Sequence, residues 1–88
     1  MPYIKPNQRP DINKLVEPLV AHIKSLAVED QDGSLNYAFT KIIKSVYPMK
    51  YFYLNRALGM LSAVTLELYR VVIGPYEDTK IKENGTVE

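Results

Sequence analysis

The pattern of apolar and polar positions along this chain is that of helices, and it is most extreme between residues 54 and 73. Apolar residues recur there at spacings of three and four, and others fill the positions between them, so little polar surface is left. Because such a helix needs cover on nearly every side, we expect the rest of the chain to pack around it and a second copy to complete the cover. The apolar residues of this segment are Leu54, Ala57, Leu58, Met60, Leu61, Ala63, Val64, Leu66, Leu68, Tyr69, Val71, Val72 and Ile73.

Narrower apolar stripes predict two further helices, over residues 11–27 and 34–47. Asp11 and Ser34 stand at their starts, and both are residue types that cap helix N-termini. Pro48 ends the second of these helices because proline cannot continue the hydrogen-bond ladder. The three predicted helices thus account for most of the chain.

Prolines shape the N-terminal part of the chain. Pro18 falls inside the first predicted helix, where proline removes a hydrogen bond and clashes with the preceding turn, at a cost of about 3 kcal/mol. We expect either a bend between Lys14 and Pro18, or a separate turn followed by a shorter helix with Pro18 in its first turn. Three more prolines among the first ten residues predict an extended arm over residues 1–10.

Polar segments separate the helices and end the chain. Residues 28–34, with the sequence VEDQDGS, are predicted to form a loop that turns at Gly33. Gly74 followed by Pro75 predicts the end of the long helix, so that residues 74–88 form a tail that composition alone makes mobile. The predicted fold is all-α. It is a three-helix bundle in one domain, residues 1–88, with a long, central, apolar C-terminal helix, an extended N-terminal arm and a C-terminal tail.

Composition narrows the functions that the chain can have. A chain of 88 residues has a small core, and without cysteine neither a disulfide nor a thiolate metal site can staple it. Eleven basic and ten acidic side chains leave a net charge of +1, which is no footprint for nucleic acid. Because Arg56, Glu67 and Arg70 interrupt the long apolar run and the N-terminus lacks a signal-peptide core, we expect a soluble cytoplasmic protein without membrane contact.

Several stretches of the sequence resemble a family of short uncharacterised proteins from bacteria, archaea and phages. The resemblance is carried by the opening MPYIK, by LNYAFTKIIK, by LNRALGMLSAVTLELYRVVIGPYED and by the closing KIKENGTV. Relatives often have arginine where this chain has Val71 and aspartate where it has Thr86. The resemblance implies a self-contained helical domain with no assigned activity or cofactor, and it implies that the tail docks on the helices or on a second subunit.

The best candidates for a ligand site lie near the end of the long helix. Glu67 and Arg70 are three residues apart and can pair across one turn, either in a functional site or as an ion pair at the edge of the core. Tyr69 lies between them, and Asn36 and Asn55 are polar residues near helix starts that could line the same pocket, although capping explains them as well.

Charges on the long helix also bear on self-association. Arg56 and Glu67 project from similar sides of the long helix but about 16 Å apart, so they would meet only between antiparallel copies. This is a prediction about a dimer and not about catalysis.

No catalytic or metal-binding set is evident. His22 is the single histidine and has no paired ligand, the serines lack a neighbouring base, and the acidic residues of 29–32 lack the twelfth-position ligand of a calcium-binding loop. The aromatic YPMKYFY segment could stack on single-stranded nucleic acid, but packing between helices explains it better. We therefore expect no metal and no cofactor.

The pattern thus favours a small non-enzymatic protein that forms a dimer or higher homo-oligomer and acts through protein contacts, with other proteins as further partners. The alternative is a small enzyme or ligand-binding protein whose site lies between subunits. That site would use Glu67, Tyr69 and Arg70, with Glu77 and Asp78 as further candidates.

Overall fold

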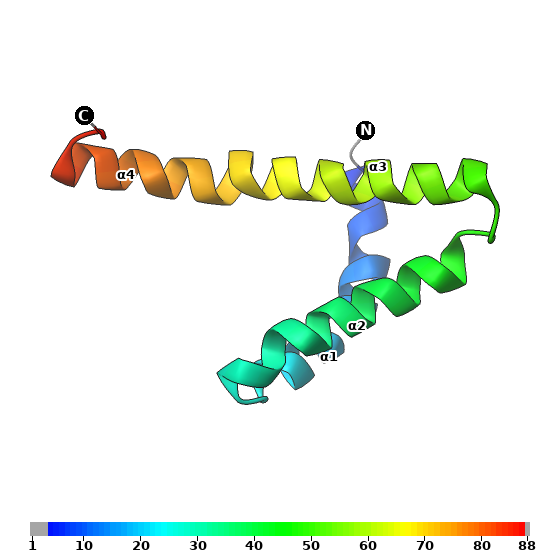
Figure 1. The fold of residues 1–88 in the computed structure, drawn as a ribbon. Helices are drawn as coiled ribbons and strands as arrows, with labels where there is room; N and C mark the ends of the chain where they lie inside the picture. Colours follow the sequence, from blue (N-terminus) through cyan, green and yellow to red (C-terminus); the bar gives the residue numbers. More distant parts are fainter. Residues whose placement is uncertain (1–3, 88) are drawn as a thin grey trace. The chain divides into compact units, whose positions relative to one another are not determined.

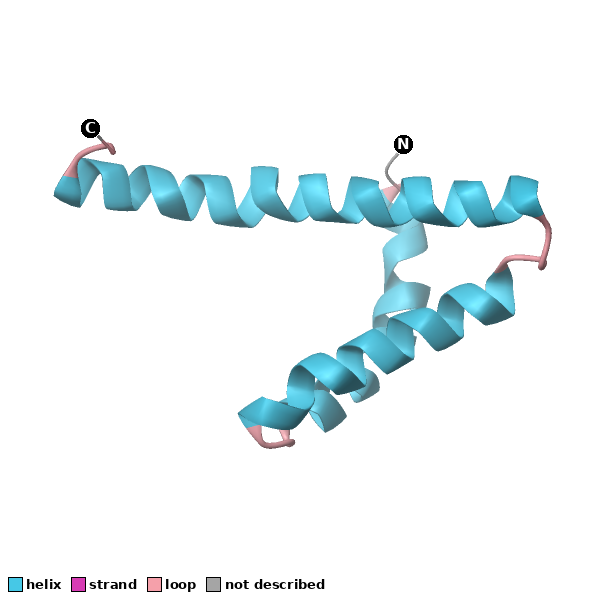
Figure 2. Ribbon diagram, viewed as in Figure 1, coloured by secondary structure: helices cyan, strands magenta, loops and turns pink. Residues whose placement is uncertain are grey.

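The computed structural model describes residues 4–87, and every regular element within that range is a helix (Figures 1 and 2). This confirms the predicted all-α class with three long helical segments. The chain divides into two compact units, Met1–Met49 and Lys50–Glu88. The first three residues of the predicted N-terminal arm lie outside the described residues.

The first unit begins with a short 3-10 helix, η1 (Pro6–Gln8), which leads into α1 (Arg9–Lys24). The prediction of an extended arm up to residue 10 is wrong for this part of it. Proline is tolerated in the first turn of a helix, where its missing N–H would have no partner in any case, and both Pro6 and Pro10 occupy such positions. The backbone N–H of Lys5 donates to Oε1 of Gln8, at 2.9 Å, and so ties down the entry to this segment.

Pro18 does not divide α1. The helix continues from Arg9 to Lys24 with Pro18 inside it, so the predicted alternative of a separate turn and a shorter helix is wrong. Asp11 is not the cap but lies in the first turn of α1. Its negative charge there interacts favourably with the positive end of the helix dipole. At the other end Ser25 closes the helix, and its hydroxyl donates to the carbonyl of His22 at 2.6 Å.

The second helix starts six residues earlier than predicted. α2 spans Val28–Val46, so the segment VEDQDGS is helical, Gly33 is an interior position and Ser34 is not a cap. Its acidic residues fit a helix start as well as a loop, because Glu29 and Asp30 lie in the first turn, at the positive end of the dipole. The amide of Gln31 reaches back to the carbonyl of Leu26 at 3.3 Å, which helps to fix the turn.

Helices α1 and α2 form a hairpin through a connection of three residues, 25–27. Its core is small: Ile23 is the buried residue of the two helices, at 8% exposure. Leu19, Leu26, Ala38 and Ile43 around the hairpin are only half-buried.

The second unit is one continuous rod. It consists of α3 (Tyr51–Leu68), a π-helical turn η2 (Tyr69–Ile73) and α4 (Gly74–Asn84), which follow one another without a break (Figure 1). The long helix therefore begins three residues before the predicted position and runs beyond residue 73. The predicted stop at Gly74 is wrong, and most of the predicted tail is helix. Gly85, at φ +79°, is the residue that ends the rod.

The π-helical turn explains how a helix passes through Gly74-Pro75. Pro75 has no N–H to donate and its ring would clash with the carbonyl four residues back, so the ordinary ladder cannot continue. The ladder widens instead, and Gly74 donates its N–H to the carbonyl of Tyr69, five residues back. Glycine also lacks the Cβ that normally drives the residue before a proline out of helical geometry. Pro75 then stands in the first turn of α4, where proline is tolerated.

Candidate functional site

The most unusual surface of the described residues is a line of apolar side chains along α3. Positions 54, 58, 61, 65 and 68 follow one another at spacings of four, three, four and three, so they form a strip about 80° wide on one side of the helix. We call this strip the leucine stripe; its members are Leu54, Leu58, Leu61, Thr65 and Leu68. Their apolar members are 36% to 65% exposed.

Thr65 is the polar member of the leucine stripe, and its polar group is already satisfied. Its hydroxyl donates to the carbonyl of Leu61, one turn back, at 3.2 Å. Covering Thr65 with another helix would therefore bury no unpaired donor, which would otherwise cost about 1 to 3 kcal/mol. The stripe behaves as an apolar seam over its whole length.

That the rest of the chain packs around the long helix stays a prediction, because it concerns both units. The rod is the whole of its unit, and at most of its large apolar side chains a third or more of the surface is exposed. By length and composition alone, the rod Tyr51–Asn84 is also apolar enough to cross a membrane.

A second apolar surface lies between α1 and α2. An open groove of about 1090 Å³ runs along the hairpin, and both apolar and polar side chains line it. Its apolar lining includes Leu19, Ile23, Leu26, Ala38 and Ile42, and its polar lining includes His22, Glu29, Asp30, Tyr37 and Lys41. Sequence reasoning did not identify this groove, although the stripes of the two amphipathic helices that face it were the available signal.

The π-helical turn brings together a small polar cluster. The hydroxyl of Tyr69 donates a hydrogen bond to the carboxylate of Glu77, and this bond is the main cause that raises the pKa of Tyr69 above its ordinary value. The negative charge of Glu77, desolvation and the charge of Asp78 raise this pKa further. A Cβ on Gly74 would lie 3.9 Å from the Tyr69 ring and only 3.1 Å from the Tyr69 carbonyl, so the bare backbone of Gly74 leaves room for this arrangement.

Among the described residues of the rod, Asn55, Glu67 and Arg70 do not form one cluster. Glu67 is half-buried and Arg70 is exposed, and no ion pair joins them in the described part of the chain. Arg70 lies in the π-helical turn, where the α-helical spacing on which the predicted pair was based does not hold. Asn55 stands fourteen residues before Tyr69 on the same rod, about 21 Å away. Asn36 belongs to the other unit, where it accepts a hydrogen bond from Thr40 at 3.2 Å.

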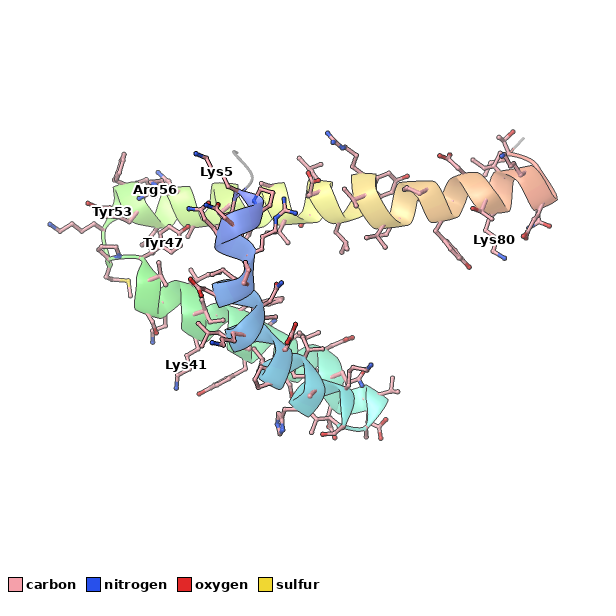
Figure 3. The ribbon with its side chains drawn as sticks, turned by 180° about the vertical axis from the view of Figure 1, so that it is seen from behind. Lys5, Lys41, Tyr47, Tyr53, Arg56 and Lys80 are labelled. Atoms are coloured by element: carbon pink, nitrogen blue, oxygen red, sulfur yellow. The ribbon has the colours of Figure 1, made fainter. Side chains whose placement is uncertain are left out.

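The remaining polar residues form local surface contacts. Between residues 4 and 87, the ion pair that forms is Lys80–Glu83, at 3.3 Å. Cations lie over tyrosine rings at 5.6 to 5.9 Å, as Lys41 does over Tyr37, Arg56 over Tyr53 and Lys80 over Tyr76. Figure 3 shows Tyr53 and Arg56 together near the start of α3, and Lys80 near the far end of the rod. No cluster of three His, Asp or Glu side chains that could hold a metal occurs among the described residues.

Comparisons with known proteins give one match. No curated protein and no solved structure matches the chain. A family model described as a domain of unknown function, DUF6899, matches residues 1–87, across both structural units. The chain therefore belongs to this family, as the resemblance of its sequence to a family of uncharacterised proteins indicated.

Proposed function

We propose that this protein is a small homo-oligomer that acts through protein contacts, and that the rod of α3 is the element through which it associates. One observation carries the proposal: an apolar helix forms a unit by itself and has no second layer of structure within that unit. Helices of soluble domains bury their apolar stripes against another element, because burial of a Leu or Val side chain contributes roughly 1.5 to 3 kcal/mol.

The exposed apolar side chains of the rod support the same proposal. Leu58, Leu66 and Leu68 of α3 are 65%, 71% and 51% exposed. Each would contribute roughly 1.5 to 3 kcal/mol if it were fully buried against a second copy, so a few such side chains are enough to favour pairing.

A membrane is a weaker candidate than a second copy. The rod has the length and mean hydropathy of a spanning helix, yet Glu67 and Arg70 stand inside its apolar stretch and would have to enter the hydrocarbon. A helical partner can leave these two side chains at the edge of the contact, in water, at little cost.

The proposal is tested by measuring the mass of the purified protein in solution without detergent, by light scattering and by sedimentation across a range of concentrations. We expect twice the mass of one chain, or a higher multiple, at micromolar concentration. The mass of one chain at every concentration would overturn the proposal. Flotation with neutral vesicles separates the membrane alternative, and recovery of the protein with the vesicles would also count against it.

The Tyr69–Glu77 cluster favours a second candidate function, a ligand site near a subunit interface. A raised tyrosine pKa and a carboxylate pair, Glu77 and Asp78, are the kind of polar groups that hold a ligand or move a proton. Thermal denaturation with nucleotides and with divalent metals tests this candidate. A specific ligand raises the melting temperature of the wild type and has less effect on Tyr69→Phe.

A further inference from the structure

We propose that two copies pair through the leucine stripe of α3, antiparallel, with their two-fold axis at the level of Ala63. This inference rests on the proposed self-association and names the surface and the register. A dimer with two-fold symmetry uses the same patch of both copies, so that patch must be complementary to itself when it is turned around. The leucine stripe meets this requirement.

The spacing of the stripe permits this register. With the axis at Ala63, Leu58 meets the partner's Leu68, and Leu61 meets the partner's Thr65. The larger Leu side chain at the centre thus faces the smaller Thr, whose hydroxyl is already bonded to the Leu61 carbonyl. Four of the five stripe positions therefore pair with a stripe position of the other spacing class, as the two kinds of seam position do in antiparallel helix pairs with a seven-residue repeat.

The positions of the charged side chains on α3 favour pairing through the leucine stripe over pairing through the opposite face of the helix. Arg56 and Glu67 lie nearly half a turn away from the stripe, at 100° per residue, so pairing through the stripe buries neither of them further. Pairing through the opposite face would bring Arg56 to the partner's Glu67, as the sequence predicted, but it would leave the leucine stripe uncovered. The buried apolar area decides between the two faces. An exposed ion pair contributes about 0 to 1 kcal/mol to the free energy of association, and each buried leucine contributes more.

A matched pair of leucines on α3 tests the face. Leu58 belongs to the stripe and is 65% exposed in one chain; Leu66 lies about 80° or more from every stripe residue and is 71% exposed. Leu58→Glu and Leu66→Glu should therefore lower the stability of a single chain by about the same amount. We expect Leu58→Glu to weaken dimerisation at least 100-fold by sedimentation, and Leu66→Glu to change it less than about fivefold. Circular dichroism confirms that both variants remain helical.

Cysteine cross-linking tests the register, because the wild-type chain has no cysteine. Leu58→Cys and Leu68→Cys chains are mixed and oxidised gently. Antiparallel pairing gives the mixed disulfide, since like residues of the two copies are about 15 Å apart, beyond disulfide reach. A parallel pair gives disulfides between like residues.

The outcomes separate this inference from the proposed function. A wild-type protein that never associates overturns both. A wild-type dimer that survives Leu58→Glu, or that is lost with Arg56→Glu and kept with Leu58→Glu, overturns the stripe and leaves self-association standing. Disulfides between like residues overturn the antiparallel register alone.

Discussion

The two units of this chain solve the same problem of covering apolar helix surface in different ways. In the α1–α2 hairpin each helix gives the other a second layer, and Ile23 is buried between them. The rod of α3, η2 and α4 has no such layer inside its unit. Helix formation is thus local in both units, whereas only the hairpin has a second helix layer within its own unit. The difference teaches that a helix can be strongly specified by its sequence without a second layer in its own unit.

The largest expected effect within one chain is on the hairpin core. Ile23→Ala removes the buried side chain between α1 and α2, and we expect it to lower the free energy of unfolding by about 2 to 5 kcal/mol. Ile12→Ala, the same change on the same helix at a 51% exposed position, is the control and should cost less than about 1 kcal/mol. Urea denaturation at a fixed protein concentration measures both. Equal costs would mean that the hairpin has no core of its own.

The π-helical turn of the rod is expected to resist any side chain at Gly74. In Gly74→Ala the new Cβ lies 3.1 Å from the Tyr69 carbonyl and also crowds Pro75, so we expect a loss of about 1 to 3 kcal/mol. Gly59→Ala, in the open interior of α3, serves as control and should stabilise the helix by up to about 1 kcal/mol. Thermal denaturation followed by circular dichroism distinguishes the two. A stabilising Gly74→Ala would contradict the widened ladder.

A smaller effect separates the helical start of α2 from the loop predicted from sequence. Gly33 is helical and a Cβ there meets nothing within 4 Å, so Gly33→Ala should stabilise the hairpin by about 0.5 to 1 kcal/mol. If residues 28–34 formed a loop that turned at Gly33 with positive φ, the same change would be destabilising. The sign of the shift in the urea midpoint distinguishes the helical start of α2 from the predicted loop.

The smallest effect concerns the Tyr69 hydroxyl. Its pKa is raised in the folded chain by the hydrogen bond to Glu77, so this bond stabilises the rod below the ordinary tyrosine pKa of about 10, and the stabilisation is lost as pH rises through the folded value. Glu77→Gln removes the charge, and we expect the pKa of Tyr69 to fall towards the ordinary value. Ultraviolet titration of tyrosinate, with Tyr69→Phe to assign the signal, measures this. An unchanged titration curve would show that the bond does not form in solution.

Much of the fold could be predicted because helix periodicity is a local property. The apolar stripes that begin at Ile12, Leu35 and Leu54 all lie in helices of the structure, and the all-α class followed from them. The wrong predictions lie where the polarity of the residues does not determine the backbone conformation. Acidic residues such as Glu29 and Asp30 suit an exposed loop and the first turn of a helix equally, and prolines such as Pro10 suit an arm and a helix start.

The candidate site was harder to predict than the fold. The sequence pointed to Tyr69 and included Glu77 among the further candidates, but it paired Glu67 with Arg70 on the assumption of an ordinary helical repeat. The ladder shift at residues 69–73 breaks that assumption, and it brings Tyr69 to Glu77 instead. The groove between α1 and α2 was not predicted, because the two apolar stripes indicate which side of each helix faces inward but not how the two helices are placed in space.

By itself, the sequence determined that this protein is helical, that residues 54–73 are apolar on nearly every side, and that no cysteine can staple the chain, because these are properties of residue types and their spacing. The three-dimensional structure decided that the rod passes through Gly74-Pro75, that Tyr69 meets Glu77, and that Ile23 is buried while the leucine stripe is exposed. Those outcomes depend on which backbone carbonyls and which helix faces come within reach of one another, and contacts of that kind exist only once the chain has folded.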